Sequence, residues 1–465
     1  MAVFSDRLDR AAVGFMAALL LIIAVVILRG DQVGVQVTRT APAADESGVG
    51  TRTQLALTFS EPMPSAALDG HILITPSITG TLRWNGATGF FLPQRPLLAD
   101  TTYTVTVLAG ARSERGRIML RQVVWSFRTG HPRLIYLSPA TGSGNLYVQE
   151  ISPDSPEHPI TSEPFGVFDF AVSPNGKQVV YSATRDPGGA RDLWVINTDG
   201  GGRQQIVACD EQLCQTPAWS ADSTRVAFER RTLVQGTLGK SPGAARIWLY
   251  DFTSKTAAPL SNDSQQLGSL PRWAPAGDRL AYYDPVAGAV TVIDVTTGDQ
   301  VQLTSVLGDT GAWSPNAQQL IYPELKAVDQ GQFNQMLRAD LVSNVITAVM
   351  PLSTTNDSSV SWSPLGTPIA FTRQRTGMGG SAGGITPFGP QIWVSTPEGN
   401  EARPLTDDAG FSYGGLAWSP DGAWIVAVRN NLLQPNPKPE VWLVRSDGSE
   451  HYRLAQDATI PAWVP

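Results

Sequence analysis

Two cysteines, Cys209 and Cys214, are the first residues of this 465-residue chain to consider for chemistry. They stand five positions apart, and neither a second cysteine pair nor a neighbouring histidine is present to complete a tetrahedral metal site. Two interpretations remain open: a pair of reduced thiols, or a disulfide that closes a small loop. Because disulfides persist in oxidising compartments, we expect the disulfide if this part of the chain lies outside the cytoplasm.

A second chemical signature is G-F-S-Y-G at Gly410–Gly414, which matches the G-x-S-x-G pattern of serine hydrolases. That pattern works only where a strand leads into the serine and a helix follows it. Here an apolar run typical of a strand follows, and no hydrolase domain comes after it. We interpret the match as coincidental.

The spacing of the histidines and the lack of nucleotide-binding motifs predict no further chemistry. The four histidines form no close pair of the HExxH type, and neither a P-loop nor a dinucleotide fingerprint is present. We therefore expect no catalytic, cofactor-binding or metal-ligating residues. One alternative stays open, because acidic residues that are distant in the sequence can gather in a fold. The histidines are His71, His131, His158 and His451.

The composition favours a chain of many short strands that does not bind nucleic acid. Charged residues make up 16%, the formal net charge is −7, and no basic block is present to neutralise phosphates. Glycine (44) and proline (35) recur along the whole chain, as expected for frequent turns. The length predicts two or three domains.

The N-terminus predicts a membrane anchor within residues 1–30. Ala11–Leu28 carries no charge and is flanked by Arg7, Arg10 and Arg29. As a helix it would span roughly 27 Å, close to the thickness of the hydrocarbon layer. We favour an uncleaved signal anchor over a cleaved signal peptide, since no clear cleavage site follows. The expected location is the cell membrane, with a single pass and the bulk of the chain outside the cytoplasm.

Residues 37–130 alternate apolar and polar positions over six or seven short runs, which is typical of a β-sandwich. The strings "LTFSEPM" (Leu57–Met63), "LADTTYTVTV" (Leu98–Val107) and "WSFRT" (Trp125–Thr129) resemble the bacterial Ig-like domain of surface proteins (the SbsA type). The resemblance implies a spacer or adhesion module. We expect Glu61 of "FSEPM" to belong to a corner between strand and turn and not to act as an acid or base.

From residue 131 to 465 the chain repeats a unit of four apolar runs, here called A to D. Run A carries "WSP" or a variant, run B an aromatic residue, run C often a tryptophan, and run D ends near "PL" or "QLT". Four short strands in each unit of 40 to 56 residues are typical of a β-propeller blade. Run A is marked by Val172, Trp219, Trp273, Trp313, Trp362, Trp418 and Trp463, which predicts seven blades, with six or eight as alternatives.

The first and last parts of the repeat region complete each other. Runs B, C and D appear at Arg133–Ser138, Asn145–Ile151 and His158–Thr161 without a run A before them. The terminal "IPAWVP" is a run A without B, C and D. We therefore expect strands from both ends to share one blade, so that the ring closes and leaves no open sheet edge.

The repeat resembles the TolB-type, WD-like propeller family, most clearly in "LAWSPDGAWIVAV" with "VWLVRSDG" (Leu416–Val428 and Val441–Gly448). The resemblance implies an all-β propeller fold but no particular function, because propellers include enzymes, ligand binders and scaffolds. We expect the repeated tryptophans to pack between blades. Asp421, Asp199 and Asp447 are expected to form tight turns.

The irregular B–C segments are better candidates for function than the repeated residues. They lie at 230–245, 324–335, 373–390 and 429–439, and the cysteine pair is expected at the same face. Insertions on one face of a repeat protein often mark its binding face, although they can also be tolerated surface. The candidate contact residues are Arg231, Lys240, Arg373, Arg375, Phe388 and Lys438.

Two hypotheses about function follow. In the first, the chain is a membrane-anchored binding or scaffold protein outside the cytoplasm, whose propeller presents its loop-rich face to an envelope protein or a surface glycan. In the second, it is a propeller enzyme, a lyase or hydrolase, with acidic residues at the mouth of the channel. We favour the first hypothesis and expect no cofactor.

Overall fold

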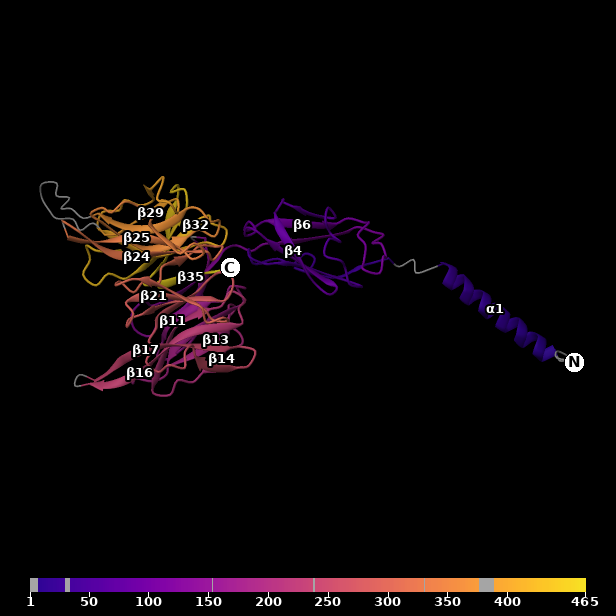
Figure 1. Cartoon of the computed structure of the whole chain (residues 1–465), viewed down its shortest axis with the longest axis horizontal. Coiled ribbons are helices and arrows are strands. Elements are labelled where there is room, and N and C mark those ends of the chain that lie inside the picture. The colour runs from indigo at the N-terminus through magenta and orange to yellow at the C-terminus, as the bar shows by residue number, and fades with distance from the viewer. Residues whose placement is uncertain (1–6, 30–33, 153, 237–238, 330, 376–388) are drawn as a thin grey trace. The chain divides into compact units, whose positions relative to one another are not determined.

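The computed structural model describes residues 7–29, 34–152, 154–236, 239–329, 331–375 and 389–465. Strands dominate the described chain, and α1 (Arg7–Arg29) is the helix among its elements. The chain divides into two compact units (Figure 1). The first contains most of the segment up to Arg128, and the second contains Thr129–Pro465 with two short earlier segments.

The predicted transmembrane anchor is not supported by the structure. α1 covers Ala11–Leu28, but among the described residues no helix is both long enough and apolar enough to cross a membrane.

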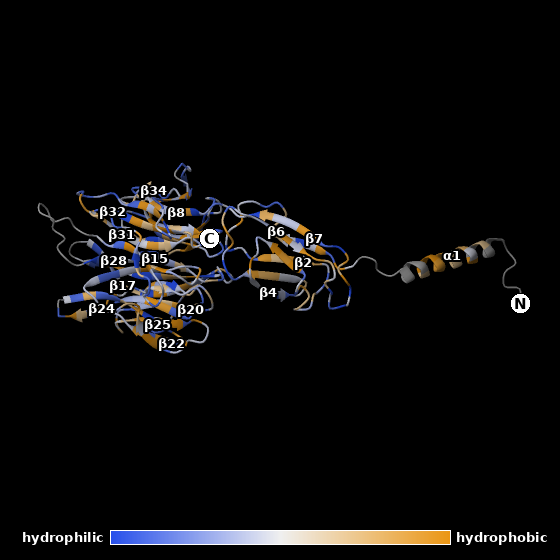
Figure 2. Ribbon diagram, turned by 90° about the horizontal axis from the view of Figure 1, so that it is seen from above, coloured by the Kyte–Doolittle hydropathy of each residue, from blue (hydrophilic) through white to orange (hydrophobic). Residues whose placement is uncertain are grey.

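The strands of the first unit form two antiparallel sheets, in the orders β1-β2-β5-β4 and β3-β6-β7. Figure 2 shows apolar residues along these strands; in β2 every second side chain is buried, namely Leu55, Leu57 and Phe59. The period-two alternation of the sequence therefore predicts the two-sheet fold correctly. The strands are β1 (Val37–Ala41), β2 (Leu55–Phe59), β3 (Ile72–Thr75), β4 (Gly80–Asn85), β5 (Thr88–Pro93), β6 (Thr102–Val107) and β7 (Val123–Arg128).

Glu61 follows β2 and is buried, as expected of a residue at a structural corner. Its Oε1 lies 3.1 Å from Nε of Arg117, so the carboxylate is compensated by a cation within the same unit. A buried carboxylate that already has an arginine partner is more consistent with a structural than with a catalytic role.

The repeat region contains antiparallel sheets in which strands A, B, C and D are neighbours in that order. The first three sets are β35 (Thr459–Val464), β8 (Arg133–Ser138), β9 (Asn145–Glu150), β10 (His158–Pro159); β11 (Val167–Val172), β12 (Gln178–Thr184), β13 (Arg191–Asn197), β14 (Gln204–Val207); and β15 (Gln212–Trp219), β16 (Arg225–Gly236), β17 (Gly239–Asp251), β18 (Thr256–Pro259). The second and third sets are joined into one sheet by a single parallel pair, Arg191 with Leu213.

The remaining sets follow the same order along the chain. They are β19 (Ser269–Trp273), β20 (Arg279–Asp284), β21 (Ala289–Asp294), β22 (Gln300–Thr304); β23 (Ala312–Trp313), β24 (Gln319–Val328), β25 (Gly331–Asp340), β26 (Val345–Ala348); β27 (Thr355–Trp362), β28 (Ile369–Arg375), β29 (Gln391–Ser395), β30 (Arg403–Pro404); and β31 (Phe411–Trp418), β32 (Trp424–Asn431), β33 (Glu440–Arg445), β34 (His451–Gln456).

The two ends of the repeat region meet in one sheet, as the incomplete repeats predict. The C-terminal strand β35 pairs antiparallel with β8, and Trp463 lies opposite Leu134. The sheet order is therefore β10-β9-β8-β35, with the last strand of the chain in position A.

Several repeated tryptophans connect one sheet to the next, which agrees with the packing role expected for them. Trp219 Nε1 donates to the carbonyl oxygen of Ala171 at 3.1 Å, from strand A of one set to strand A of the preceding set. Three further bonds of this kind run from Trp313 to Arg272, from Trp418 to Ser361 and from Trp463 to Ala417. The last of these joins the C-terminal strand to β31.

The turn after "WSP" or "WSA" is built in three of the sets by one serine and one Asx side chain. In "WSPDG", Ser419 Oγ donates to Asp421 Oδ1 at 2.5 Å and accepts the N–H of Trp424 at 2.9 Å. The same pattern recurs at Ser220 with Asp222 and at Ser314 with Asn316. Asp421 thus closes a turn, as predicted.

Two of the predicted irregular segments are regular strands. Residues 230–236 and 239–245 lie in the long hairpin of β16 and β17, and residues 324–328 and 331–335 lie in β24 and β25 (Figure 1). Their outer parts mix polar residues with a few apolar ones, such as Val234 and Leu325, so the sequence has no continuous apolar run there to mark a strand. The backbone N–H and C=O groups nevertheless pair across each hairpin, which satisfies their need for hydrogen bonds.

Candidate functional site

Exposed apolar side chains of the repeat region gather at one end of its sheets. We call this the B–C end: the B–C and D–A connections with the adjoining residues of their strands. Of the fifteen exposed large apolar residues described in 131–465, eleven lie there and four lie elsewhere. The eleven are Phe165, Phe168, Val234, Leu270, Val286, Val306, Leu307, Leu352, Leu432, Leu433 and Ile460.

The cysteine pair lies at the B–C end, where β14 leads into β15. The structure joins Cys209 and Cys214 in a disulfide, and both residues are fully buried. The N–H of Cys209 donates to Asp192 Oδ1 at 2.8 Å. The buried disulfide therefore holds the segment that leads from β14 into β15, and it presents no free thiol at the surface.

Most A strands have an irregularity that interrupts their pairing with strand B. The register shifts in β11, β15, β19, β27, β31 and β35, and Thr216, Leu270, Ser359 and Ile460 have φ between 48° and 53°. Such bulges release an N–H from the ladder and redirect nearby side chains.

Two carboxylates of preceding sets accept these released N–H groups. Asp169 Oδ2 accepts the N–H of Thr216 at 2.6 Å, and Glu229 Oε1 accepts the N–H of Leu270 at 2.7 Å. The charge of Glu229 is compensated by Arg231, whose Nε lies 2.7 Å from Oε2. Gln215 Nε2 also donates to this carboxylate, at 3.3 Å.

Asp169 differs from Glu229 because no cation of the described residues lies within 4 Å of it. Its Oδ1 is buried without a hydrogen-bond partner among those residues. Burial raises the pKa of Asp169 to about 7, against the weaker lowering effects of the Thr216 N–H and of Arg191. This carboxyl group therefore changes its charge near neutral pH.

Arg191 lies beside Asp169 at the start of β13. Its Nη1 donates to Gln215 Oε1 at 2.6 Å, and its guanidinium lies 3.5 Å from the ring centroid of Phe168. Burial lowers the pKa of Arg191, while the charge of Asp169 acts in the opposite direction. Sequence analysis missed this group because its members come from three strands, although Asp169 interrupts the apolar run Val167–Val172 and was a usable signal.

Two of the predicted contact residues have buried carboxylate partners at the B–C end. Arg231 is bound to Glu229, and Arg373 makes two bonds to the buried Asp357, at 2.7 Å and 2.8 Å. Arg375 lies 5.5 Å from the ring centroid of Trp393 and is exposed.

The other predicted contact residues are more accessible. Lys240 lies 3.2 Å from Glu211, and Lys438 lies 2.6 Å from Asp457. Both lysine side chains are exposed, at 42% and 65%. Phe388 lies outside the described residues. The structure thus brings Arg231 close to the Asp169 group but does not bring the six predicted residues together.

A second arginine site at the B–C end was also missed. Arg429 lies between two rings, 4.0 Å from the centroid of Phe411 and 3.6 Å from that of Trp442. Its Nη2 is 3.0 Å from Glu440 Oε2, and Glu440 also binds Arg453. This arginine therefore has a carboxylate partner, which it shares with Arg453.

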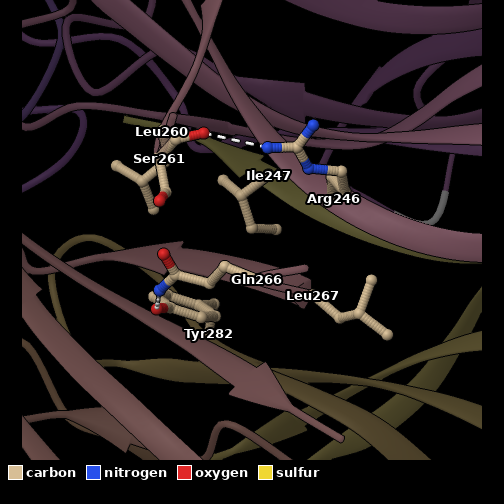
Figure 3. A pocket seen from close by; sticks show the side chains of 7 residues that line it. All are labelled: Arg246, Ile247, Leu260, Ser261, Gln266, Leu267 and Tyr282. Carbon is tan, nitrogen blue, oxygen red and sulfur yellow. Dashed lines mark hydrogen bonds between the residues drawn. The ribbon is translucent and has the colours of Figure 1, made fainter. Parts of the chain in front are cut away.

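Figure 3 shows a small hollow between the third and fourth sets of strands, where Arg246 and Ile247 face Gln266 and Tyr282. Arg246 Nη2 donates to the carbonyl oxygens of Ser261 and Asp263, and Gln266 Nε2 donates to Tyr282 Oη at 2.7 Å. The hollow measures about 10 Å³, which is the size of one water molecule. Arg246 Nε is buried there without a partner among the described residues, so the hollow suits one ordered water.

Two further hollows were found, one in each unit. One of about 20 Å³ lies beside Arg373 and Trp393. One of about 550 Å³ lies in the first unit, between residues 34–37 and 119–123. Within the described part of the chain, no three His, Cys, Asp or Glu side chains lie close enough together to hold a metal ion.

The sandwich unit can be assigned from its sequence. Residues 31–129 match the bacterial Ig-like domain family. The first unit is a bacterial Ig-like domain. This confirms the resemblance found in its strand sequences.

The chain has similarities to TolB and to peptidases. Over 66 residues the chain is 38% identical to dipeptidyl-peptidase 5 of Porphyromonas gingivalis, which is 13% of this chain and 10% of that protein. The matched stretch thus spans about a tenth of that relative. TolB from Acinetobacter baumannii aligns over 85% of this chain and 83% of its own, with 13% identity and a TM-score of 0.43. The β-propeller domain of the Trilobed protease from Pyrococcus furiosus aligns over 77% and 93%, with 8% identity and a TM-score of 0.46.

Proposed function

We propose that the repeat region is a seven-bladed β-propeller and that the chain is a binding or scaffold protein whose B–C end holds a protein partner. The blade count is supported by the A strands β35, β11, β15, β19, β23, β27 and β31, each of which begins one set of four strands. Successive A strands also contact one another, from β35 to β11, β15 and β19 and from β23 to β27, β31 and β35. Such an arrangement leaves B–C connections on a single face.

The observation that carries the binding proposal is the gathering of exposed apolar residues at the B–C end. Exposed apolar patches on the surface of a folded protein often mark sites of protein interaction. Nine of the eleven residues are aliphatic and two are phenylalanine. A glycan site would present tryptophan or tyrosine faces with polar groups around them, so the composition favours a polypeptide over a glycan.

A paired-variant experiment tests this function. Val286→Ser, Val306→Ser and Leu433→Ser together would remove exposed apolar surface from the B–C end. Val342→Ser and Val345→Ser would do the same at residues 67% and 51% exposed that lie elsewhere, and they serve as the matched control. Quantitative cross-linking in intact cells of the source organism should recover a specific polypeptide with the wild type and the control but at least tenfold less with the triple variant.

The proposal fails if the triple variant recovers the same polypeptide as efficiently as the control. It also fails if the cross-linked material is a glycan that periodate destroys. Circular dichroism melting of all three proteins verifies that the variants are folded, since exposed substitutions of this kind change stability little.

We further propose that the repeat region lies outside the cytoplasm, in the cell envelope. The disulfide between Cys209 and Cys214 supports this location, because cytosolic thiols are kept reduced. Protease added to intact cells or spheroplasts should cleave the repeat region, and mass spectrometry after thiol alkylation should find both cysteines protected. A repeat region that is resistant until the cells are lysed would contradict this location.

A further inference from the structure

The arginines at the B–C end differ in whether a carboxylate compensates them. Arg373 and Arg429 each have a carboxylate oxygen within 3.0 Å, and Arg231 has one at 2.7 Å. Arg191 has none within 4 Å among the described residues, although it is partly buried. Its one hydrogen bond with those residues goes to a neutral amide, that of Gln215. A partly buried cation without a counter-charge is costly, so the site favours an anion.

The neighbouring acid does not supply that counter-charge below neutral pH. Asp169 is the nearest candidate, but burial favours its neutral form. Glu229, which also acts on Asp169, is already bound to Arg231 and to the N–H of Leu270. Below neutral pH, therefore, the positive charge of Arg191 remains uncompensated within the group.

The guanidinium of Arg191 is held in place and remains partly open. Gln215 fixes Nη1, and Phe168 covers one face of the plane at 3.5 Å. The Nε atom of Arg191 is buried and has no hydrogen-bond partner among the described residues. Nη2 also makes no hydrogen bond with a described residue, but this atom is not fully buried. Phe168 itself is 41% exposed. A fixed donor next to an exposed ring can bind a carboxylate and an apolar group side by side.

We propose that Arg191 and Phe168 form an anchor site for a carboxylate that is attached to an apolar group, such as an acidic side chain or C-terminus beside a hydrophobic residue of the partner. This inference rests on the proposed function of the B–C end and specifies the partner's chemistry. An arginine stacked on an aromatic ring is the kind of pair that contributes most energy in protein interfaces. The carboxylate would accept from Nη2 while the apolar group covers Phe168.

A fragment pair tests the site without knowledge of the partner. 4-Fluorobenzoate and 4-fluorobenzamide have nearly the same shape but differ in charge, and their binding to the full chain can be followed by fluorine NMR at pH 6. We expect 4-fluorobenzoate to bind saturably and 4-fluorobenzamide at least tenfold more weakly. Arg191→Gln should weaken binding of the benzoate at least tenfold, and Phe168→Ser should weaken binding of both fragments.

The matched control is Arg445→Gln. Arg445 lies 5.4 Å from the ring centroid of Trp424, but it lies at the C–D turn and not at the B–C end. This variant should bind the benzoate as the wild type does. Equal binding of both fragments, or unchanged benzoate binding by Arg191→Gln, would overturn the inference. Either result would leave the proposed function intact, provided that the B–C triple variant still loses its cross-linked polypeptide. Failure of this inference and failure of the proposed function can therefore be distinguished.

Discussion

At the scale of single residues, the group around Asp169 shows how one missing partner changes the chemistry of a buried carboxyl group. Asp169 and Glu229 each accept an N–H from the A strand of the next set, at 2.6 Å and 2.7 Å. Glu229 is paired with a cation and Asp169 is not, and Asp169 is left near its titration point at neutral pH. Burial raises the pKa of Asp169, and the hydrogen bond from Thr216 does not offset this effect.

Asp169 should make the stability of the repeat region depend on pH. Its pKa is raised from 3.8 to about 7 in the folded chain, so between these values the folded state holds a proton that the unfolded state has released. Stability should therefore fall as pH rises from about 4 to about 7 and change no further from this group above that. Each unit of pKa shift corresponds to about 1.4 kcal/mol, which urea unfolding at several pH values can resolve.

Asp169→Asn keeps the acceptor for the Thr216 N–H and removes the titration. The variant should lose this fall in stability between about pH 4 and pH 7, while Asp421→Asn, in the turn that follows β31, should keep it. An unchanged pH profile for Asp169→Asn would show that another group is responsible.

The same ionisation should control the anchor site. Below pH 7 Asp169 is mainly neutral and Arg191 attracts a carboxylate, whereas above it the ionised Asp169 compensates Arg191 and repels the ligand. The groups that act on Asp169 are Arg191 of β13, Glu229 of β16 and the Thr216 N–H of β15. Affinity for 4-fluorobenzoate should fall several-fold between pH 6 and pH 8 in the wild type. In Asp169→Asn it should stay level, and a parallel fall in both proteins would contradict the coupling.

At the scale of elements, the A strands were predictable because "WSP" and the following apolar run repeat. The long hairpins β16–β17 and β24–β25 were not, since their outer residues mix polar and apolar types and do not continue the apolar run of the inner part of the strand. The Asp169 group was missed for a different reason. Asp169, Arg191 and Thr216 are 22 to 47 positions apart along the chain, and no spacing rule connects residues of different strands over such distances.

The tryptophan bonds between sheets should contribute measurably to stability. Trp418→Phe removes the hydrogen bond from the indole N–H to the half-buried Ser361 carbonyl, at a cost of about 1 kcal/mol. Trp424→Phe is the control, because its indole N–H makes no hydrogen bond with a described residue and its ring packs on Tyr452. Urea unfolding should give a lower midpoint for Trp418→Phe than for Trp424→Phe. Equal midpoints would show that packing of the ring, and not its hydrogen bond, joins the sheets.

At the scale of the whole molecule, the incomplete final repeat has a structural consequence. β35 pairs with β8, and Trp463 donates to Ala417 of β31 at 3.0 Å. β35 thus supplies strand A of the first set and also forms a hydrogen bond with strand A of the last set, β31. Residues separated by more than three hundred positions depend on each other, so the repeat region should gain much of its cooperativity only when its last residues are in place.

Removal of residues 458–465 tests this dependence. The truncated chain loses β35 and exposes one edge of β8, so it should melt at least 10 °C lower and aggregate at micromolar concentration, because an open edge can pair with another chain. A synthetic peptide of residues 457–465 added in trans should restore much of the melting temperature, and a peptide with the same residues in scrambled order should not. Rescue by the native peptide separates the loss of pairing from a general folding defect. A truncated chain that melts like the wild type and stays soluble would show that the sheets hold together without β35, in which case the terminal "IPAWVP" is a peripheral strand and not the join between the two ends of the repeat region.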